Sequence, residues 1–278
     1  MISIRTRKLL LKLVAYVVLG LGAVIMAGPF VWMLSTSLKE PAQQFSRDLI
    51  PSPVVFQNYF NLSDTLPIGR LLLNSAKITL LVIVGQVLTC SMSGFVFAVL
   101  QFRFRDQIFM ALLATLMIPA QMALIPDFII FKWIGLLGTQ APLWLPAFWG
   151  GAFGTFLLRQ FFLTIPLDLA EAARVDGASI FQIFWRIYLP LAGPALAALT
   201  IFTFLFSWND LLGPLIYLPS NLDLTTITVG LSLFQGQYGG KWTLMMAGAV
   251  ISIAPVIIIF FLAQRQFIEG IATSGVKG

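Results

Sequence analysis

The sequence contains no histidine, and Cys90 is its only cysteine. These absences exclude a structural zinc site, a disulfide within the chain and a Cys–His nucleophilic pair. The G-x-x-x-x-G-K-[ST] phosphate loop is absent too, because the nearest stretch, GQYGGKW at 236–242, has the wrong glycine spacing. We therefore predict that the chain is not an enzyme and has no catalytic residues, metal or cofactor of its own. A nucleotide that drives it would bind another subunit.

Charge is scarce as well. Only 10% of the 278 residues are charged and 59% are hydrophobic, whereas about a quarter of an ordinary soluble domain is charged. The apolar residues form unbroken runs, several of them near the roughly 20 residues that a helix needs to cross a bilayer, and not the alternating segments of a barrel. The net charge of +6 follows the flanks of these runs, so no nucleic-acid partner is expected. The sequence predicts an all-α polytopic membrane protein.

Six apolar runs are expected to be transmembrane helices. Pro119 and Pro126 fall inside the third run and predict kinks there. In the fourth run, Gly150, Gly151 and Gly154 allow another helix to approach closely. The expected spans are 13–34, 71–100, 108–130, 142–158, 191–218 and 244–263.

The basic residues predict the orientation of these spans. Six spans place both termini on one side of the membrane, and basic residues prefer the cytoplasmic side. This orientation leaves only Lys39, Arg47, Lys132 and Lys241 outside. The residues inside are Arg5, Arg7, Lys8, Lys12, Arg103, Arg105, Arg159, Arg174, Arg186, Arg265 and Lys277. The expected parts are a cytoplasmic basic N-terminus (1–12), a six-helix transmembrane domain (13–264) and a cytoplasmic C-terminal tail (265–278).

The cytoplasmic stretch 162–190 carries charge between two apolar runs. Pro166 suits the first turn of a helix rich in alanine, and Gly177 marks a turn before an aromatic helix. Small residues permit close backbone approach, and Glu171 and Arg174 supply charge at the rim of such a contact. The pattern predicts a peg for the cleft of a cytoplasmic partner. On composition alone, an amphipathic helix lying on the membrane surface is an equal alternative.

This stretch, EAARVDGAS followed by an aromatic helix and LP, resembles the EAA loop of permease subunits in binding-protein-dependent ABC importers. In that family the loop is the coupling helix that docks on the ATP-binding subunit. The resemblance implies that role for Glu171, Ala172, Ala173, Asp176, Gly177 and Ala178.

Three further motifs narrow the resemblance. LLNSAKITL before the second span, SWNDLLGPLIYL in the fifth and the ending QRQFIEGIATSGVKG are similar to the carbohydrate-uptake branch, in particular to the G-type permease of the maltose transporter. The resemblance covers nearly the whole chain. It implies the type I ABC importer permease fold, with six transmembrane helices and a cytoplasmic EAA loop.

The resemblance also implies partners and a location. The partners would be a second permease subunit in a heterodimer, two copies of an ATP-binding subunit that hold ATP and Mg, and an extracytoplasmic sugar-binding protein. The location would be the bacterial cytoplasmic (inner) membrane, with membrane lipid around the chain. The substrate would be an oligosaccharide, a disaccharide or a polyol, and a glycerol phosphate fits the same branch.

Polar residues interrupt the fifth apolar run. Asn209 and Asp210 lie where a charged group costs at least about 2.5–3.5 kcal/mol on insertion scales. They either hydrogen-bond to substrate in the pathway or satisfy backbone groups at a helix break near Gly213 and Pro214. The neighbouring aromatic residues are candidate platforms for a sugar ring, with helix packing as the alternative: Phe204, Trp208 and Tyr217.

The stretch SLFQGQYGGKW at 232–242 is polar and rich in glycine. It predicts an external loop able to enter the cleft of a partner. The family resemblance implies contact with the extracytoplasmic binding protein, for which Gln235, Gln237 and Tyr238 are the candidates. A flexible connector is the alternative.

These observations predict the permease subunit of an ATP-driven sugar importer, in which closure of the ATPase is coupled to alternating access through the EAA loop. The alternative is an ion-coupled secondary transporter. Such a transporter needs ionisable residues within its spans and an internal repeat with broken helices. The spans contain only Lys77, Asp127 and Asp210 of this kind, and no convincing repeat is visible.

Overall fold

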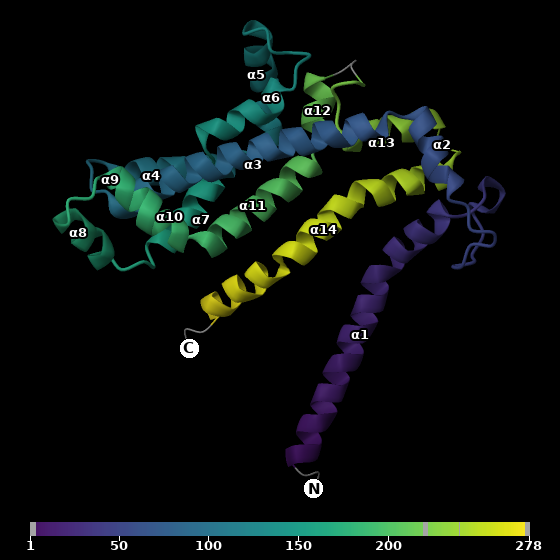
Figure 1. Ribbon diagram of the computed structural model, residues 1–278, viewed down its shortest axis with the longest axis horizontal. Helices are drawn as coiled ribbons and strands as arrows, with labels where there is room; N and C mark the ends of the chain where they lie inside the picture. Colours follow the sequence, from purple (N-terminus) through teal and green to yellow (C-terminus); the bar gives the residue numbers. More distant parts are fainter. Residues whose placement is uncertain (1–3, 219–221, 239, 276–278) are drawn as a thin grey trace. The chain divides into compact units, whose positions relative to one another are not determined.

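The computed structural model describes residues 4–218, 222–238 and 240–275, with side chains for 8–218, 222–236, 240–262 and 264 (Figure 1). All regular secondary structure in these residues is helical. The chain forms two compact units. One contains Met1–Ile68 and Leu231–Ile253, and the other contains Gly69–Gly230 and Ala254–Gly278.

The first unit joins the N-terminal helix to residues far along the chain. It contains α1 (Ile4–Ser37), the 3-10 turn η1 (Pro41–Gln43) and α2 (Gln57–Thr65), with the end of α13 (Ile227–Tyr238) and the start of α14 (Trp242–Gly275). None of the most apolar window of α1 is buried. Such a helix needs a lipid or protein environment, because its apolar surface would otherwise face water.

A set of polar contacts fixes the loop after α1. Asn58 donates from Nδ2 to the carbonyl oxygens of Ser37 and Lys39, both at 2.8 Å, so α2 closes the C-terminal end of α1. Lys39 is fully buried, and its ammonium donates to the Ser46 carbonyl at 2.9 Å. The same ammonium lies 4.6 Å from the centre of the Trp32 ring. The loop is therefore held to the helices at several points.

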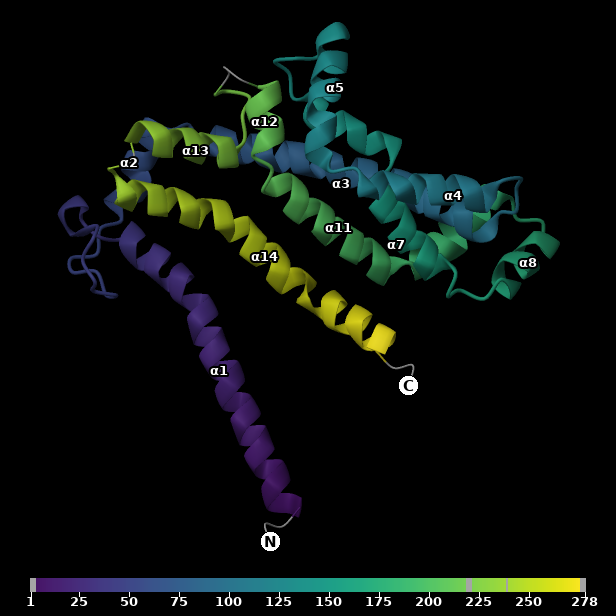
Figure 2. The ribbon, with the colours of Figure 1, turned by 180° about the vertical axis from the view of Figure 1, so that it is seen from behind.

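The second unit is built around the long helix α3 (Ile68–Val99). Helices α7 (Ala152–Phe162) and α11 (Gly193–Trp208) run beside one another in it, as Figures 1 and 2 show. A Cβ on Gly154 would lie 2.7 Å from the sulfur of Cys90 on α3, so glycine is required for this approach. The remaining helices are α4 (Arg105–Ala114), α5 (Ala120–Trp133), α6 (Ala141–Trp144), α8 (Asp168–Val175), α9 (Ile180–Ile183), α10 (Leu189–Leu191) and α12 (Leu212–Tyr217).

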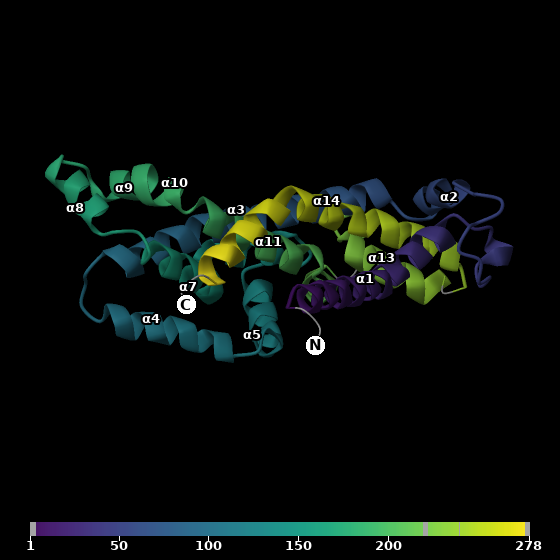
Figure 3. The same ribbon diagram turned by 90° about the horizontal axis from the view of Figure 1, so that it is seen from below.

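The predicted spans correspond to helices of the structure. Among the described residues, four helices are long and apolar enough to cross a membrane, and up to six are if each bent pair counts as one span. The third span is such a pair, because α4 and α5 are bent by 98° on either side of Pro119 (Figure 3). The kink predicted at Pro119 is confirmed. Pro126 lies inside α5.

The helix found for the fifth span is shorter than the predicted range, 191–218. Helix α11 ends at Trp208, and α12 contains both Gly213 and Pro214. The helix break therefore precedes these two residues. Pro214 is tolerated in the first turn of α12, because the amide hydrogen that proline lacks would have no helical partner there. The segment before α11 is helical as well, and the pair Ile180–Leu191 and Gly193–Trp208 is bent by 77°.

The predicted glycine-rich loop at 232–242 is wrong for most of its length. Residues up to Tyr238 belong to α13, and only the part of the stretch after that helix connects it to α14. Ile227, Val229 and Phe234 of α13 are buried, and this packing outweighs the low helix propensity of the glycines. Helix α14 continues to Gly275 and so extends into the predicted tail, 265–278.

Candidate functional site

The charged stretch of the sequence forms a bent helical segment, which we call the elbow (residues 166–191). Its first helix, α8, ends at a left-handed glycine, Gly177, with φ of 83°. The Ala178 amide donates to the Ala173 carbonyl at 2.9 Å and the Gly177 amide to the Arg174 carbonyl at 3.0 Å. This pair of bonds is the Schellman motif, which needs positive φ at the residue after the helix cap. The turn predicted at this position is confirmed.

The second half of the elbow begins with a capping box. The Ser179 hydroxyl accepts from the Gln182 amide at 3.3 Å, and the Gln182 side chain accepts from the Ser179 amide at 2.8 Å. Helix α9 then continues through a π-helical turn, Phe184–Tyr188, into α10. The turn and both helices are thus set by local sequence.

The inner face of the elbow is anchored by aromatic residues. Tyr188 is fully buried, and its ring centre lies 5.0 Å from that of Phe95 on α3 and 5.7 Å from that of Phe162 on α7. The Phe184 ring is 5.3 Å from the same Phe95 ring. The two Tyr188 pairs are edge-on and the Phe184 pair is tilted, and such aromatic contacts add to the burial energy. In Figures 1 and 2 the elbow accordingly lies beside the C-terminal end of α3.

The predicted contact residues divide between the two faces of the elbow. Ala173 and Ala178 are partly buried and pack against the aromatic core, as does the fully covered Ala170. The other four predicted residues lie on the outer face and are exposed: Glu171, Ala172, Asp176 and Gly177. Two exposed apolar side chains accompany them, Val175 at 88% and Phe181 at 62%. The elbow therefore presents a mixed apolar and charged surface, and its opposite face packs against α3 and α7.

The residues predicted for a membrane pathway are occupied by structural contacts. Phe204 and Trp208 are buried and stacked on one another, with ring centres 5.4 Å apart. Asn209 donates to the Leu205 carbonyl at 2.8 Å. Asp210 accepts the Gly213 amide at 3.1 Å and so supports the start of α12. Of the two roles considered for Asn209 and Asp210, these bonds are of the structural kind.

Tyr217 is buried as well, at the end of α12. Its ring packs edge-on against Phe131 of α5, with ring centres 5.5 Å apart. Tyr217 therefore links α12 to α5, and each of these short helices follows a helix break.

A cluster of polar contacts that the sequence analysis did not find holds residues 222–227, which we call the strap. Asn74 on α3 donates from Nδ2 to the carbonyls of Asp223 at 2.8 Å and Thr225 at 3.0 Å. Arg70 pairs with the Asp223 carboxylate. The remaining contacts are a bond from Gln140 Nε2 to the Leu224 carbonyl at 2.6 Å and one from the Ile227 amide to Ser75 at 2.9 Å. Asn74 and Ser75 within LLNSAKITL were the signal for this cluster.

The three candidates on α13 are only partly described. Gln235 is exposed. Gln237 and Tyr238 belong to the helix, but their side chains lie outside the described residues.

Within the part of the chain that the structure describes, no group of three or more His, Cys, Asp or Glu side chains could hold a metal ion. The one cysteine, Cys90, is buried and donates to the Gln86 side chain at 3.0 Å.

Comparison with known proteins gives matches over nearly the whole chain. Residues 91–272 match the profile of the family described as binding-protein-dependent transport system inner membrane component. The arabinooligosaccharides transport system permease protein AraQ of Halalkalibacterium halodurans is 39% identical over 205 residues, which are 74% of this chain and 73% of that protein. The lactose transport system permease protein LacG of Rhizobium radiobacter is 32% identical over 268 residues, which are 96% of this chain and 97% of that protein.

A solved structure is similar over almost the same extent. It is a chain of a bacterial ABC transporter involved in the import of the acidic polysaccharide alginate. The TM-score is 0.82 at 26% sequence identity, with 95% of this chain and 98% of that chain covered. The helical arrangement described above is therefore that of an importer subunit.

Proposed function

Because the chain belongs to the family of binding-protein-dependent transport system inner membrane components, it is a multi-pass permease of a bacterial inner-membrane ABC importer, and we propose that its elbow couples this permease to the ATPase. ATP is bound by a partner subunit in this family and not by the permease. The family assignment displaces the ion-coupled transporter that the sequence left as an alternative.

The observation that carries the coupling proposal is the contrast between the two faces of the elbow. Its inner face is fixed by Tyr188 and Phe184 to α3 and α7. Its outer face presents Glu171, Ala172 and Val175 without covering contacts from the described chain. A partner that pushes on the outer face therefore moves packed helices as a body, and this is how coupling between distant sites is transmitted.

The proposed assembly follows the expectations from the sequence. It contains this chain, a second permease subunit, two ATP-binding subunits with ATP and Mg, and an extracytoplasmic binding protein. Both termini and the elbow lie in the cytoplasm, with 1–12 as the basic N-terminus, 13–264 as the transmembrane domain and 265–278 as the tail. Gln235, Gln237 and Tyr238 contact the binding protein.

We further propose that the transported solute is a sugar. AraQ and LacG, by their names, serve arabinooligosaccharides and lactose, and both are similar to this chain over most of its length. Phe204, Trp208, Asn209, Asp210 and Tyr217 remain the candidates for the pathway. Their contacts favour a supporting role, in which they shape the helix break and do not bind the solute directly.

The test combines copurification with uptake. The tagged chain is purified gently from its native membranes and its partners are identified by mass spectrometry, and ATP-driven uptake of the binding protein's ligand is measured in proteoliposomes. Glu171→Lys is expected to reduce uptake at least tenfold and to weaken retention of the ATPase, because it reverses a charge on the exposed contact face. Membrane insertion should be unchanged.

Asp48→Lys is the matched control, since Asp48 is also exposed but lies in the loop between α1 and α2. It is expected to leave uptake and ATPase retention within twofold of the original values. Unchanged uptake and ATPase retention in Glu171→Lys would refute the coupling role of the elbow. Recovery of the chain without any ATPase would refute the proposed assembly.

A further inference from the structure

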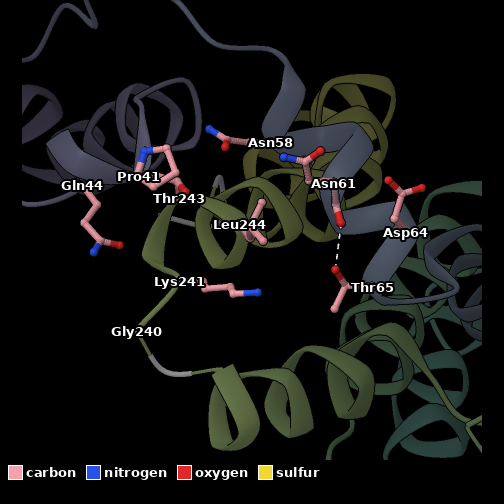
Figure 4. A pocket seen from close by; sticks show the side chains of 10 residues that line it. All are labelled: Pro41, Gln44, Asn58, Asn61, Asp64, Thr65, Gly240, Lys241, Thr243 and Leu244. Atoms are coloured by element: carbon pink, nitrogen blue, oxygen red, sulfur yellow. Dashed lines mark hydrogen bonds between the residues drawn. The ribbon is translucent and has the colours of Figure 1, made fainter.

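A polar pocket of about 430 Å³ lies in the first unit, between the loop after α1, helix α2 and the start of α14 (Figure 4). Its volume is within the range of about 300–1,000 Å³ that is usual for small-molecule sites. Helix α2 contributes Asn58, Asn61, Asp64 and Thr65, and the facing wall contains Lys241 and Thr243. The proposed transport function uses none of these residues.

The α2 wall offers both hydrogen-bond donors and acceptors. Asn58, Asn61 and Thr65 follow helical spacing and lie on one face. Asn58 uses both amide hydrogens on main-chain carbonyls, which leaves its oxygen as an acceptor. The Asn61 oxygen accepts from Gln57 at 3.2 Å, which leaves its amide hydrogens as donors. Thr65 donates to the Asn61 carbonyl at 2.8 Å, so its oxygen lone pairs are the groups that remain for a ligand.

The facing wall balances the charge of the pocket. Figure 4 shows the Lys241 side chain extending into the opening toward Thr65. Asp64 lies at the edge of the same pocket and carries the opposite charge. Among the residues that line the pocket, Pro41 and Leu244 have apolar side chains. A lining with one cation, one anion and several uncharged polar groups is unsuited to a lipid tail or to a strongly charged ion.

The walls are held in place before any ligand binds. Gln44 accepts the Trp242 amide at 3.1 Å through its side-chain oxygen and thereby caps the first turn of α14. The Phe45 and Trp242 rings pack edge-on, with centres 6.4 Å apart. Buried Lys39 holds the same loop through the Ser46 carbonyl. Binding to such a preorganised pocket loses little side-chain entropy.

We propose that this polar pocket binds an uncharged, hydroxyl-rich solute, namely a small saccharide or polyol. Each hydroxyl group of such a solute both donates and accepts, which matches the mixed groups of the α2 wall. On the proposed topology the pocket opens on the extracytoplasmic side, and this placement rests on the proposed function. The pocket would then hold solute outside the membrane, on the permease itself.

The test measures solute binding to the assembled transporter in nanodiscs, without binding protein and without ATP. Lactose and glycerol are the uncharged probes, glycerol 3-phosphate is the anionic probe, and binding is followed by saturation-transfer NMR. The variant Asn61→Leu/Thr65→Val removes hydrogen-bonding groups from the wall while changing side-chain size little. We expect at least a tenfold increase in the Kd of an uncharged probe. The control Ser63→Ala, on the exposed side of the same helix, should change the Kd less than twofold.

Three outcomes would overturn the proposal: no uncharged probe binds, the double variant binds as well as the original protein, or glycerol 3-phosphate binds in preference to glycerol. ATP-driven uptake in the same preparation separates this proposal from the proposed function. Intact uptake without pocket binding would refute the pocket alone. Labelling of Asp64→Cys by a membrane-impermeant maleimide from the cytoplasmic side only would refute the extracytoplasmic placement.

Discussion

At the residue scale, Gly177 is the position where the backbone itself decides the shape of the elbow. Its φ of 83° lies in the left-handed region, and an added Cβ would meet no neighbouring atom within 4 Å. A substitution there is therefore strained by its backbone conformation and not by steric contact. The left-handed conformation costs residues other than glycine roughly 1–2 kcal/mol, although asparagine tolerates it better.

Gly177→Ala is predicted to reduce ATP-driven uptake about fivefold or more, because the turn between α8 and α9 loses its preferred geometry. Gly177→Asn should retain most of the uptake. The control is Gly193→Ala, which has equal space around it, has no positive φ and lies at the start of α11. Uptake assays on the three variants check the prediction, and equal loss in Gly177→Ala and Gly177→Asn would show that side-chain contact matters and φ does not.

Asp210 allows a second test at this scale. Its carboxylate accepts the Gly213 amide, and asparagine accepts such a bond equally well. Asp210→Asn is therefore predicted to keep uptake within about twofold. Asp210→Ala should lower stability by about 0.5–2 kcal/mol, the usual effect of losing such a cap.

Thermal unfolding in detergent and uptake in proteoliposomes measure the two effects separately. A large loss of uptake in Asp210→Asn, with normal stability, would instead show that transport needs the negative charge of Asp210.

At the scale of elements, the aromatic core decides how firmly the elbow is mounted. The Tyr188 ring is enclosed by Phe95 and Phe162, and its hydroxyl has no hydrogen-bond partner among the described residues. Tyr188→Phe is predicted to leave stability and uptake unchanged or to raise stability slightly. Tyr188→Ala should cost about 3–5 kcal/mol through loss of packing and formation of a cavity. Thermal unfolding of both variants checks this, and strong destabilisation by Tyr188→Phe would reveal a bond to the hydroxyl.

The strap allows a similar stability prediction for the N-terminal part of α3. Asn74→Leu removes the donor from the carbonyls of Asp223 and Thr225. The bond to Thr225 is buried, and a buried carbonyl left without a donor costs about 1–3 kcal/mol. The unfolding temperature is expected to fall clearly. Leu73→Ala is the control, since Leu73 is 72% exposed on the same helix and should matter little. Equal unfolding temperatures for Asn74→Leu and the original protein would contradict the role of Asn74.

At the scale of the whole molecule, the single cysteine makes the topology directly testable. Cys90 is buried and should react slowly, so an introduced cysteine reports its own location. Ser63→Cys is predicted to react with an impermeant maleimide in intact spheroplasts. Ser179→Cys, in the elbow, should react only after the membrane is opened. The reverse pattern would overturn the orientation that the basic residues predict.

Much of the architecture could be read from the chain because it depends on local chemistry. Apolar runs of sufficient length predict spans, Pro119 predicts a bend, and glycine after an alanine-rich helix predicts a turn. The bend and the turn are correct in the structure, and the runs correspond to helices, although the helix of the fifth run ends at Trp208. These features depend on residues adjacent in sequence. The EAA-like motif also led to the correct family, because all of its residues lie within one short segment of the sequence.

Contacts between distant segments could not be read in the same way. The sequence by itself determined the membrane class, the bent third span and the turn at Gly177, because hydrophobicity and backbone conformation act locally. Only the tertiary structure decided that Ala173 and Ala178 face inward, that 232–238 is helical, and that Asn74 holds Asp223 and Thr225. It alone also brought Asn61 and Lys241 to the walls of one pocket, because burial is set by which segments meet.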